Sequence, residues 1–179
     1  MRDLARNLSK LKGDRYLGAL IIEAVWRRES HGEPREMPRL LCRSRRFLTA
    51  ETWSRSESLA VTMLLGCGSK AVCRAVPPHG HLPDAEDIWR IFSTEEISEF
   101  IKQTGDTNPL HQGARPVVPG LLILESLLTE EGFLGCSIVR VKFRQAAFAG
   151  DPLRLSASNG RFSIRSGELL LCDGQKSCI

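Results

Sequence analysis

The sequence lacks any long apolar run, and this absence excludes the simplest membrane-spanning architecture. No uninterrupted apolar stretch approaches the ~18 residues that a transmembrane helix requires. The charged segment 1–15 also lacks the apolar core of a signal peptide, and it forms either a short amphipathic helix or a solvated tail. We therefore expect a cytoplasmic protein with no membrane partner.

The six cysteines include no CxxC pair, which is the spacing typical of zinc and redox motifs. Nothing in the sequence indicates secretion, so we expect reduced thiols, several of them in strands. His79 and His81 could chelate a metal ion, but two ligands in a Pro/Gly loop without an acidic or cysteine partner make a poor site. The sequence therefore predicts no metal and no cofactor.

The net charge of +4 comes with a cluster of arginines between residues 27 and 46. No aromatic residues are interleaved with these arginines, and no recognition motif accompanies them, so we expect no nucleic-acid partner. The arginines form either a solvated face or a surface that attracts phosphate groups.

Most of the functional signal lies in residues 105–125, GDTNPLHQGARPVVPGLLILE. A polar loop brings a carboxylate, an amide and an imidazole together in Asp106, Asn108 and His111. Prolines then precede an apolar run, which predicts a helix that begins near residues 118–120. The free N–H groups of that helix would point back at the loop and suit a developing negative charge. Glu125 is the only acid in the apolar run, so it is either paired, used in chemistry or at the solvent edge.

Two related families resemble this stretch. The segment GDTNPLH, residues 105–111, resembles the signature loop of the MaoC-like (R)-specific enoyl-CoA hydratases, and this resemblance implies that Asp106 and His111 are a catalytic pair. The segment RPVVPGLL, residues 115–122, is similar to the RPxVHGxL start of their central helix. Pro119 departs from that pattern, because it replaces the histidine of the family.

The short spacing between His111 and the PGLLILE helix resembles instead the β-hydroxyacyl-ACP dehydratases, in which the helix Glu is the second catalytic group. This resemblance implies a role for Glu125. Together the two resemblances cover residues 92–152, about a third of the chain. Both imply an α+β hot-dog fold, in which an antiparallel sheet wraps round a central helix. They also imply an acyl-CoA or acyl carrier protein thioester as partner, whose acidic groups would attract the arginines.

A possible internal repeat predicts a tandem of two hot-dog halves. GALIIE at 18–23 resembles GLLILE at 120–125. We expect a degenerate first half at 1–76, a linker at 77–85, and a second half at 86–179 with the loop and helix. This tandem would be a pseudo-dimer in which, by resemblance to the ACP dehydratases, His111 faces Glu23. The alternative is a single hot-dog with an N-terminal extension that forms a homodimer.

The predicted reaction is reversible dehydration of a (3R)-hydroxyacyl thioester to the trans-2-enoyl thioester. His111 would take the α-proton, and Asp106, Glu23 or Glu125 would protonate the departing hydroxyl. The Gly120 N–H would bind the thioester oxygen, and Asn108 would shape the loop through hydrogen bonds to the backbone. An acyl thioesterase and a non-catalytic acyl-thioester-binding protein remain alternatives.

The patterning also predicts the remaining elements. Residues 16–26 are a buried helix or strand, and a capping box at Ser93 opens a helix that runs to about residue 104. The other predicted strands are 40–48, 59–65, 70–76, 88–92, 137–148, 153–158, 161–165 and 168–172.

Overall fold

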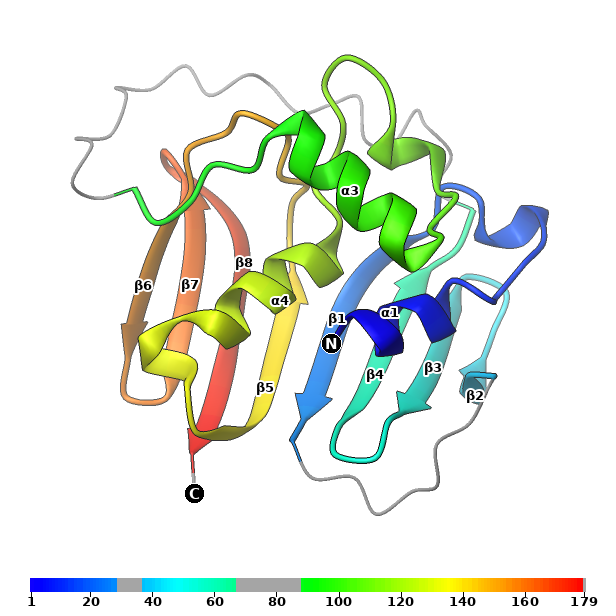
Figure 1. Ribbon diagram of the computed structural model, residues 1–179, viewed down its shortest axis with the longest axis horizontal. Helices are drawn as coiled ribbons and strands as arrows, with labels where there is room; N and C mark the ends of the chain where they lie inside the picture. The colour runs from blue at the N-terminus through cyan, green and yellow to red at the C-terminus, as the bar shows by residue number, and fades with distance from the viewer. Residues whose placement is uncertain (29–36, 67–87, 179) are drawn as a thin grey trace.

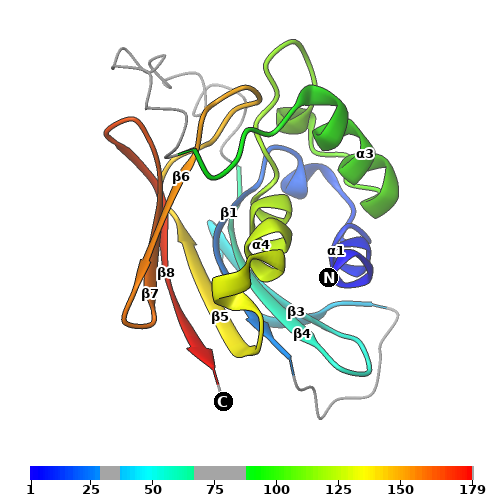
Figure 2. The ribbon, with the colours of Figure 1, turned by 60° about the vertical axis from the view of Figure 1, so that its left-hand side comes forward.

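The computed structural model describes residues 1–28, 37–66 and 88–178. Within these ranges the strands form one antiparallel 8-stranded sheet, and helices lie against its concave face (Figures 1 and 2). The strands are β1 Leu20–Arg27, β2 Arg39–Arg43, β3 Phe47–Trp53, β4 Ser58–Leu64, β5 Cys136–Phe143, β6 Arg154–Ser158, β7 Arg161–Ser166 and β8 Leu169–Cys178. The α-helices are α1 Arg2–Leu8, α3 Thr94–Thr104 and α4 Gly120–Thr129, and short 3-10 turns are η1 Asp14–Tyr16, η3 Pro109–His111 and η4 Glu131–Phe133.

The strand order is β2-β3-β4-β1-β5-β8-β7-β6. The four strands that precede residue 67 lie on one side of the sheet, and the four that follow residue 87 lie on the other. Read outward from the middle, each group has the same internal order, which is first, fourth, third and second strand. Strands β1 and β5 meet at the centre, where Ala24 pairs with Val141 and Trp26 pairs with Val139.

Helix α4 is apolar around nearly its whole circumference, which is typical of a helix enclosed by protein. Leu124 and Leu127 are fully buried, and each contributes about 1.5–3 kcal/mol by leaving water. They belong to the same core cluster as Val139 and Val141 of β5. The predicted arrangement of an antiparallel sheet around one central helix is therefore observed.

Helix α3 begins and ends at the residues that the sequence indicates. The Ser93 side chain accepts a hydrogen bond from the Glu96 N–H at 3.1 Å, so it caps the first turn. Gly105 ends the helix in the left-handed region at φ 71°, where a glycine carries no steric penalty. This end matters because the polar loop follows at once.

Several predicted elements need correction. Residues 18–23 lead into a strand, β1, so their echo of the central helix does not reflect a shared structure. Strand β5 ends at Phe143 rather than at residue 148, and residues 88–92 contribute only an isolated bridge between Arg90 and Leu153. The predicted strand at 40–48 is two strands, β2 and the start of β3. The predicted strand 70–76, the linker 77–85, His79 and His81 lie outside the described residues.

Four cysteines lie in described strands and all four are free thiols, as expected. Burial raises the pKa of Cys172 to about 12. Burial also raises the pKa of Cys136 to about 11, with a contribution from Cys178 beside it. Both buried thiols therefore stay protonated and pack as small apolar side chains. Across the described part of the chain, no helix combines the length and apolarity needed to cross a membrane.

Candidate functional site

The polar loop after α3 is fixed by its own side chains. Asp106 Oδ1 accepts a hydrogen bond from the Asn108 N–H at 2.9 Å, and Asn108 Oδ1 accepts one from the Leu110 N–H at 3.2 Å. These two successive side-chain turns replace the backbone pairing that a loop lacks. The loop then closes in the 3-10 turn η3, which ends at His111.

Asn108 also ties the loop to the N-terminal part of the chain. Its Nδ2 donates to the Ala19 carbonyl at 2.8 Å, immediately before β1. The Asn108 side chain thus hydrogen-bonds the backbone of the loop itself, at Leu110, and the backbone of the segment before β1, at Ala19. Because Ala19 leads into the strand at the centre of the sheet, this bond fixes the loop relative to both strand groups.

A hydrogen bond to the backbone determines the tautomer of His111. Its Nδ1 lies 2.8 Å from the Val117 carbonyl oxygen, and a carbonyl oxygen only accepts. Nδ1 therefore carries the proton, and Nε2 of the neutral ring carries the lone pair. Nε2 lies 3.6 Å from Oδ2 of Asp106. The imidazole is 11% exposed and the carboxylate 33%, so the pair meets solvent chiefly on the carboxylate side.

The first turn of α4 lies beside the same loop. The backbone leads from Val117, which binds His111, through Pro119 to the first helical residue, Gly120. Among the described residues, no acceptor faces the N–H groups of Gly120 and Leu121. Pro119 contributes its backbone here, because its carbonyl accepts the first hydrogen bonds of the helix, from the N–H groups of Leu122 and Ile123.

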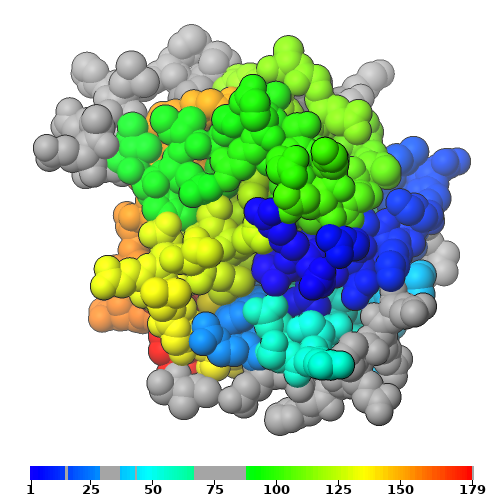
Figure 3. Space-filling view, viewed as in Figure 1, coloured from blue at the N-terminus to red at the C-terminus, as the bar shows by residue number. Residues whose placement is uncertain are grey.

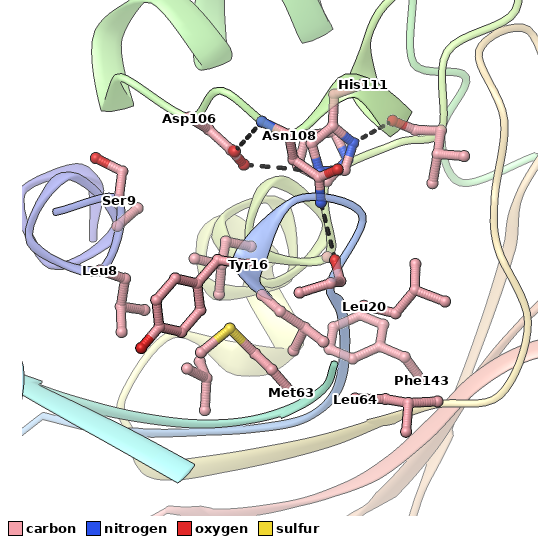
Figure 4. A pocket seen from close by; sticks show the side chains of 18 of the residues that line it. Leu8, Ser9, Tyr16, Leu20, Met63, Leu64, Asp106, Asn108, His111 and Phe143 are labelled. Carbon is pink, nitrogen blue, oxygen red and sulfur yellow. Dashed lines mark hydrogen bonds and ion pairs between the residues drawn. The ribbon is translucent and has the colours of Figure 1, made fainter. Parts of the chain in front are cut away.

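These groups open onto one cavity of about 580 Å³ (Figure 4). Asp106, Asn108, His111 and the start of α4 line its polar side. The remaining wall is mostly apolar and comes from α1, η1, β1, β4, α3 and the segment after β5. The larger apolar side chains of the whole lining include Leu8, Leu11, Tyr16, Leu20, Met63, Phe100, Ile123 of α4 and Phe143 at the end of β5. The cavity has the size and the mixed lining of a small-molecule site.

The structure does not bring Glu23 into this cavity. In β1 it lies opposite Lys142, and its carboxylate is 3.8 Å from Arg140. Arg140 and Lys142 are exposed, whereas Val139 and Val141 face α4. Glu23 alternates with Ala24, which pairs with Val141 on the inner face, so Glu23 points to the sheet face away from α4. A β-bulge separates it from Ile21, which lines the cavity.

Glu125 also lies outside the cavity. Both of its carboxylate oxygens are 3.0 Å from Nε of Arg2 in α1, and its side chain is 18% exposed. The hydrogen bond to Glu125 raises the pKa of Arg2 above its ordinary value. Of the alternatives for this acid, the structure shows a paired carboxylate on the side of α4 that meets α1.

The sequence analysis missed the residues that α1 and β4 contribute to the cavity. Leu4, Ala5 and Leu8 are buried at a helical spacing, and this spacing was the available signal for α1. Met63 had no such signal, because nothing in the sequence of β4 reveals which of its side chains line a cavity.

No known family model matches the sequence, and no curated protein matches it. Solved structures do match. HtdX from Mycobacterium tuberculosis is 14% identical over 94% of this chain and 78% of its own, with a TM-score of 0.60. A second structure of HtdX is 15% identical over 91% of this chain and 78% of its own, with a TM-score of 0.58. A MaoC-like dehydratase from Phytophthora capsici is 12% identical over 94% of this chain and 72% of its own, with a TM-score of 0.48.

The predicted α+β hot-dog fold is confirmed. At these identities the likeness concerns the fold.

Proposed function

We propose that the protein catalyses reversible hydration and dehydration between trans-2-enoyl and (3R)-hydroxyacyl thioesters of CoA or acyl carrier protein. The observation that carries this proposal is the pair formed by His111 and Asp106. Nε2 and Oδ2 are 3.6 Å apart, and both line the cavity that the first turn of α4 also lines.

An oxygen that donates and accepts could reach both groups from the cavity side, since 3.6 Å leaves no room for an atom directly between them. A neutral Nε2 and an ionised Oδ2 are both acceptors, so they need a shared proton or a neighbouring O–H group. A water molecule, or the β-hydroxyl of a substrate, provides that group. The reacting oxygen would then lie within reach of a base and an acid at once.

In the dehydration direction, Nε2 of His111 removes the α-proton, and the C–H electrons form the new double bond through an enolate-like state. Asp106, in its protonated form, gives its proton to the departing β-hydroxyl, which leaves as water. The imidazolium and carboxylate that result return to their starting states when the proton passes from His111 to Asp106. Hydration runs through the same steps in reverse.

The enolate-like oxygen needs a donor, and the N–H of Gly120 is available for it. A single donor of this kind typically contributes about 3 kcal/mol to the transition state. The dipole of α4 acts in the same sense, because its positive end faces the loop. The role of Gly120 is thus to bind the thioester oxygen as negative charge develops.

Replacement of either member of the pair tests this function. We expect His111→Ala and Asp106→Asn each to lower the hydration of crotonyl-CoA by roughly 10²–10⁴-fold. The measurement is the loss of enoyl absorbance, with circular dichroism to verify folding. Glu23→Gln is the matched control, because Glu23 lies on the opposite face of the sheet, and it should retain the wild-type rate. Undiminished hydration by a folded His111→Ala variant would end the proposal.

The thioesterase alternative needs a helix acid at the reacting carbonyl. Glu125 is held by Arg2 and does not line the cavity, so the geometry favours hydration. Release of free thiol from acyl-CoA without loss of enoyl absorbance would select the thioesterase. Binding of thioesters without turnover would select a non-catalytic role.

We further propose that the chain is a pseudo-dimer of two hot-dog halves, residues 1–76 and 86–179, joined by a linker at 77–85. The support is the strand order, which is the same in each group when read outward from the β1–β5 pair. In this arrangement the polar loop of the second half reaches the first half through the bond from Asn108 to Ala19. Because only the second half carries the polar loop, this arrangement would give one active site per chain.

A further inference from the structure

Helix α1 has no part in the proposed chemistry, yet it forms a wall of the cavity. It packs on α3 and on β3, between these two elements in the space-filling view (Figure 3). Leu4 and Leu8 are both buried on its inner face. Leu8 lines the cavity and Leu4, one turn earlier, does not.

Three segments meet around Leu8 at this wall. Tyr16 comes from η1 and Met63 from β4, and both pack, as Leu11 does, against the small apolar cluster of Ala19, Leu48 and Leu65. Figure 4 shows Leu8, Tyr16 and Met63 grouped across the cavity from the labelled polar residues of the loop. The cavity thus has a reactive polar side and an apolar side that α1 closes.

Helix α1 is held in place by hydrogen bonds to the helices around it. Arg2 binds the carboxylate of Glu125 on α4 at 3.0 Å. The Arg6 Nε donates to the Gln103 carbonyl at 3.1 Å, and the Ser9 hydroxyl donates to the Thr104 carbonyl at 2.7 Å. These contacts join α1 to both α3 and α4, so the position of Leu8 is set by a network rather than by one contact.

We propose that α1 is the end wall of the acyl-chain chamber and that Leu8, with Tyr16 and Met63, sets the length of acyl chain that the site accepts. The inference rests on the proposed function, because the His111–Asp106 pair would hold the reacting carbons at the polar side. An apolar chain would then run toward α1, where it meets the apolar side chains of Leu8, Tyr16 and Met63. The charged lining residues nearest this wall, Lys12 and Asp14, lie between α1 and Tyr16. A cavity of about 580 Å³ far exceeds a four-carbon acyl group. The substrates are therefore thioesters whose acyl chains extend well beyond crotonyl.

Replacement of Leu8 by a larger and by a smaller side chain tests whether it limits the length of the acyl chain. The measurement is kcat/KM for the crotonyl, hexenoyl, octenoyl and dodecenoyl CoA thioesters. Leu8→Trp should move the optimum to shorter chains and Leu8→Ala to longer ones, by about fourfold for each methylene excluded or admitted. Leu4→Ala is the matched control. It removes a buried leucine from the same helix without touching the cavity, so it should lower stability and leave the chain-length profile unchanged.

A binding measurement separates this inference from the proposed reaction. The affinities of a series of S-alkyl-CoA thioethers, which cannot be hydrated, report the chamber alone. Met63→Trp, on β4, provides a second variant and should also favour shorter chains if Leu8→Trp does not fold. Shifted thioether affinities without any hydration would refute the hydratase but support the wall. A profile unchanged in every folded Leu8 and Met63 variant, or a wild type that binds no thioether, would overturn the inference.

Discussion

At the residue scale, the proposed chemistry depends on two hydrogen bonds that orient His111 and Asp106. The Val117 carbonyl fixes one proton on Nδ1 of His111 and leaves Nε2 as the base. The Asp106 carboxylate receives the Asn108 N–H on Oδ1, which leaves Oδ2 for the side facing His111. Each member of the pair is thus oriented by a backbone group of its own neighbourhood, before any substrate arrives.

Gly120 provides a prediction at this scale. A Cβ at this position would lie 3.0–3.3 Å from the ring of Phe143, so glycine allows the first turn of α4 to rest on that ring. Gly120→Ala should displace the N–H donor and lower kcat by up to about 100-fold. The double variant Gly120→Ala/Phe143→Leu, which removes the crowding, should regain part of the rate. Steady-state hydration kinetics measure both, and a Gly120→Ala enzyme with full kcat would contradict this role.

The sequence predicted part of this site because that part is local. Asp106, Asn108 and His111 lie within six residues, and the helix start at Gly120 follows from the prolines before it. Glu23 could not be placed in the same way, because the sequence left residues 16–26 open as a helix or a strand. In the strand observed, Glu23 alternates with the buried Ala24 and therefore lies on the outer face of the sheet.

At the element scale, the β2–β3 and β3–β4 turns of the N-terminal strand group contain no glycine, asparagine or proline. The β2–β3 turn is capped by Ser44, whose hydroxyl accepts from the Phe47 N–H at 2.9 Å. The β3–β4 turn repeats this device with Ser54 and the Glu57 N–H at 3.1 Å. Serine turns carry no Gly, Asn or Pro signal, so the sequence analysis ran residues 40–48 together and missed most of β3.

The contact between β7 and β8 gives a prediction of stability. Gly174 pairs with Phe162, and an added Cβ would overlap both the Phe162 ring and the Arg140 carbonyl oxygen. Because neither can retreat within the sheet, Gly174→Ala should lower the free energy of unfolding by about 1–3 kcal/mol. Gly132→Ala is the control, since its Cβ would meet only the flexible end of Lys176 at 3.3 Å. Urea denaturation measures both, and equal midpoints would refute the argument.

At the scale of the whole molecule, the two strand groups share an order but not a helix. Within residues 1–28 and 37–66 the only α-helix is α1, and it lies over the N-terminal strand group while α4 lies over the centre of the sheet (Figure 1). The cavity lies between these helices. The sequence could not predict this arrangement, because it depends on contacts between residues far apart in the chain, such as Arg2 with Glu125, which are 123 positions apart.

This long-range pair supports the last prediction. Arg2 is 46% exposed, so its pairing with Glu125 should contribute only about 0.2–1 kcal/mol of coupling energy. The measurement is a double-mutant cycle of Arg2→Gln and Glu125→Gln by urea denaturation, and the coupling should shrink at high salt. Glu125→Gln should keep the wild-type rate of crotonyl-CoA hydration, in contrast to Asp106→Asn. If Glu125→Gln instead abolished hydration at unchanged stability, the carboxylate would belong to the chemistry and the assignment of the acid to Asp106 would fall.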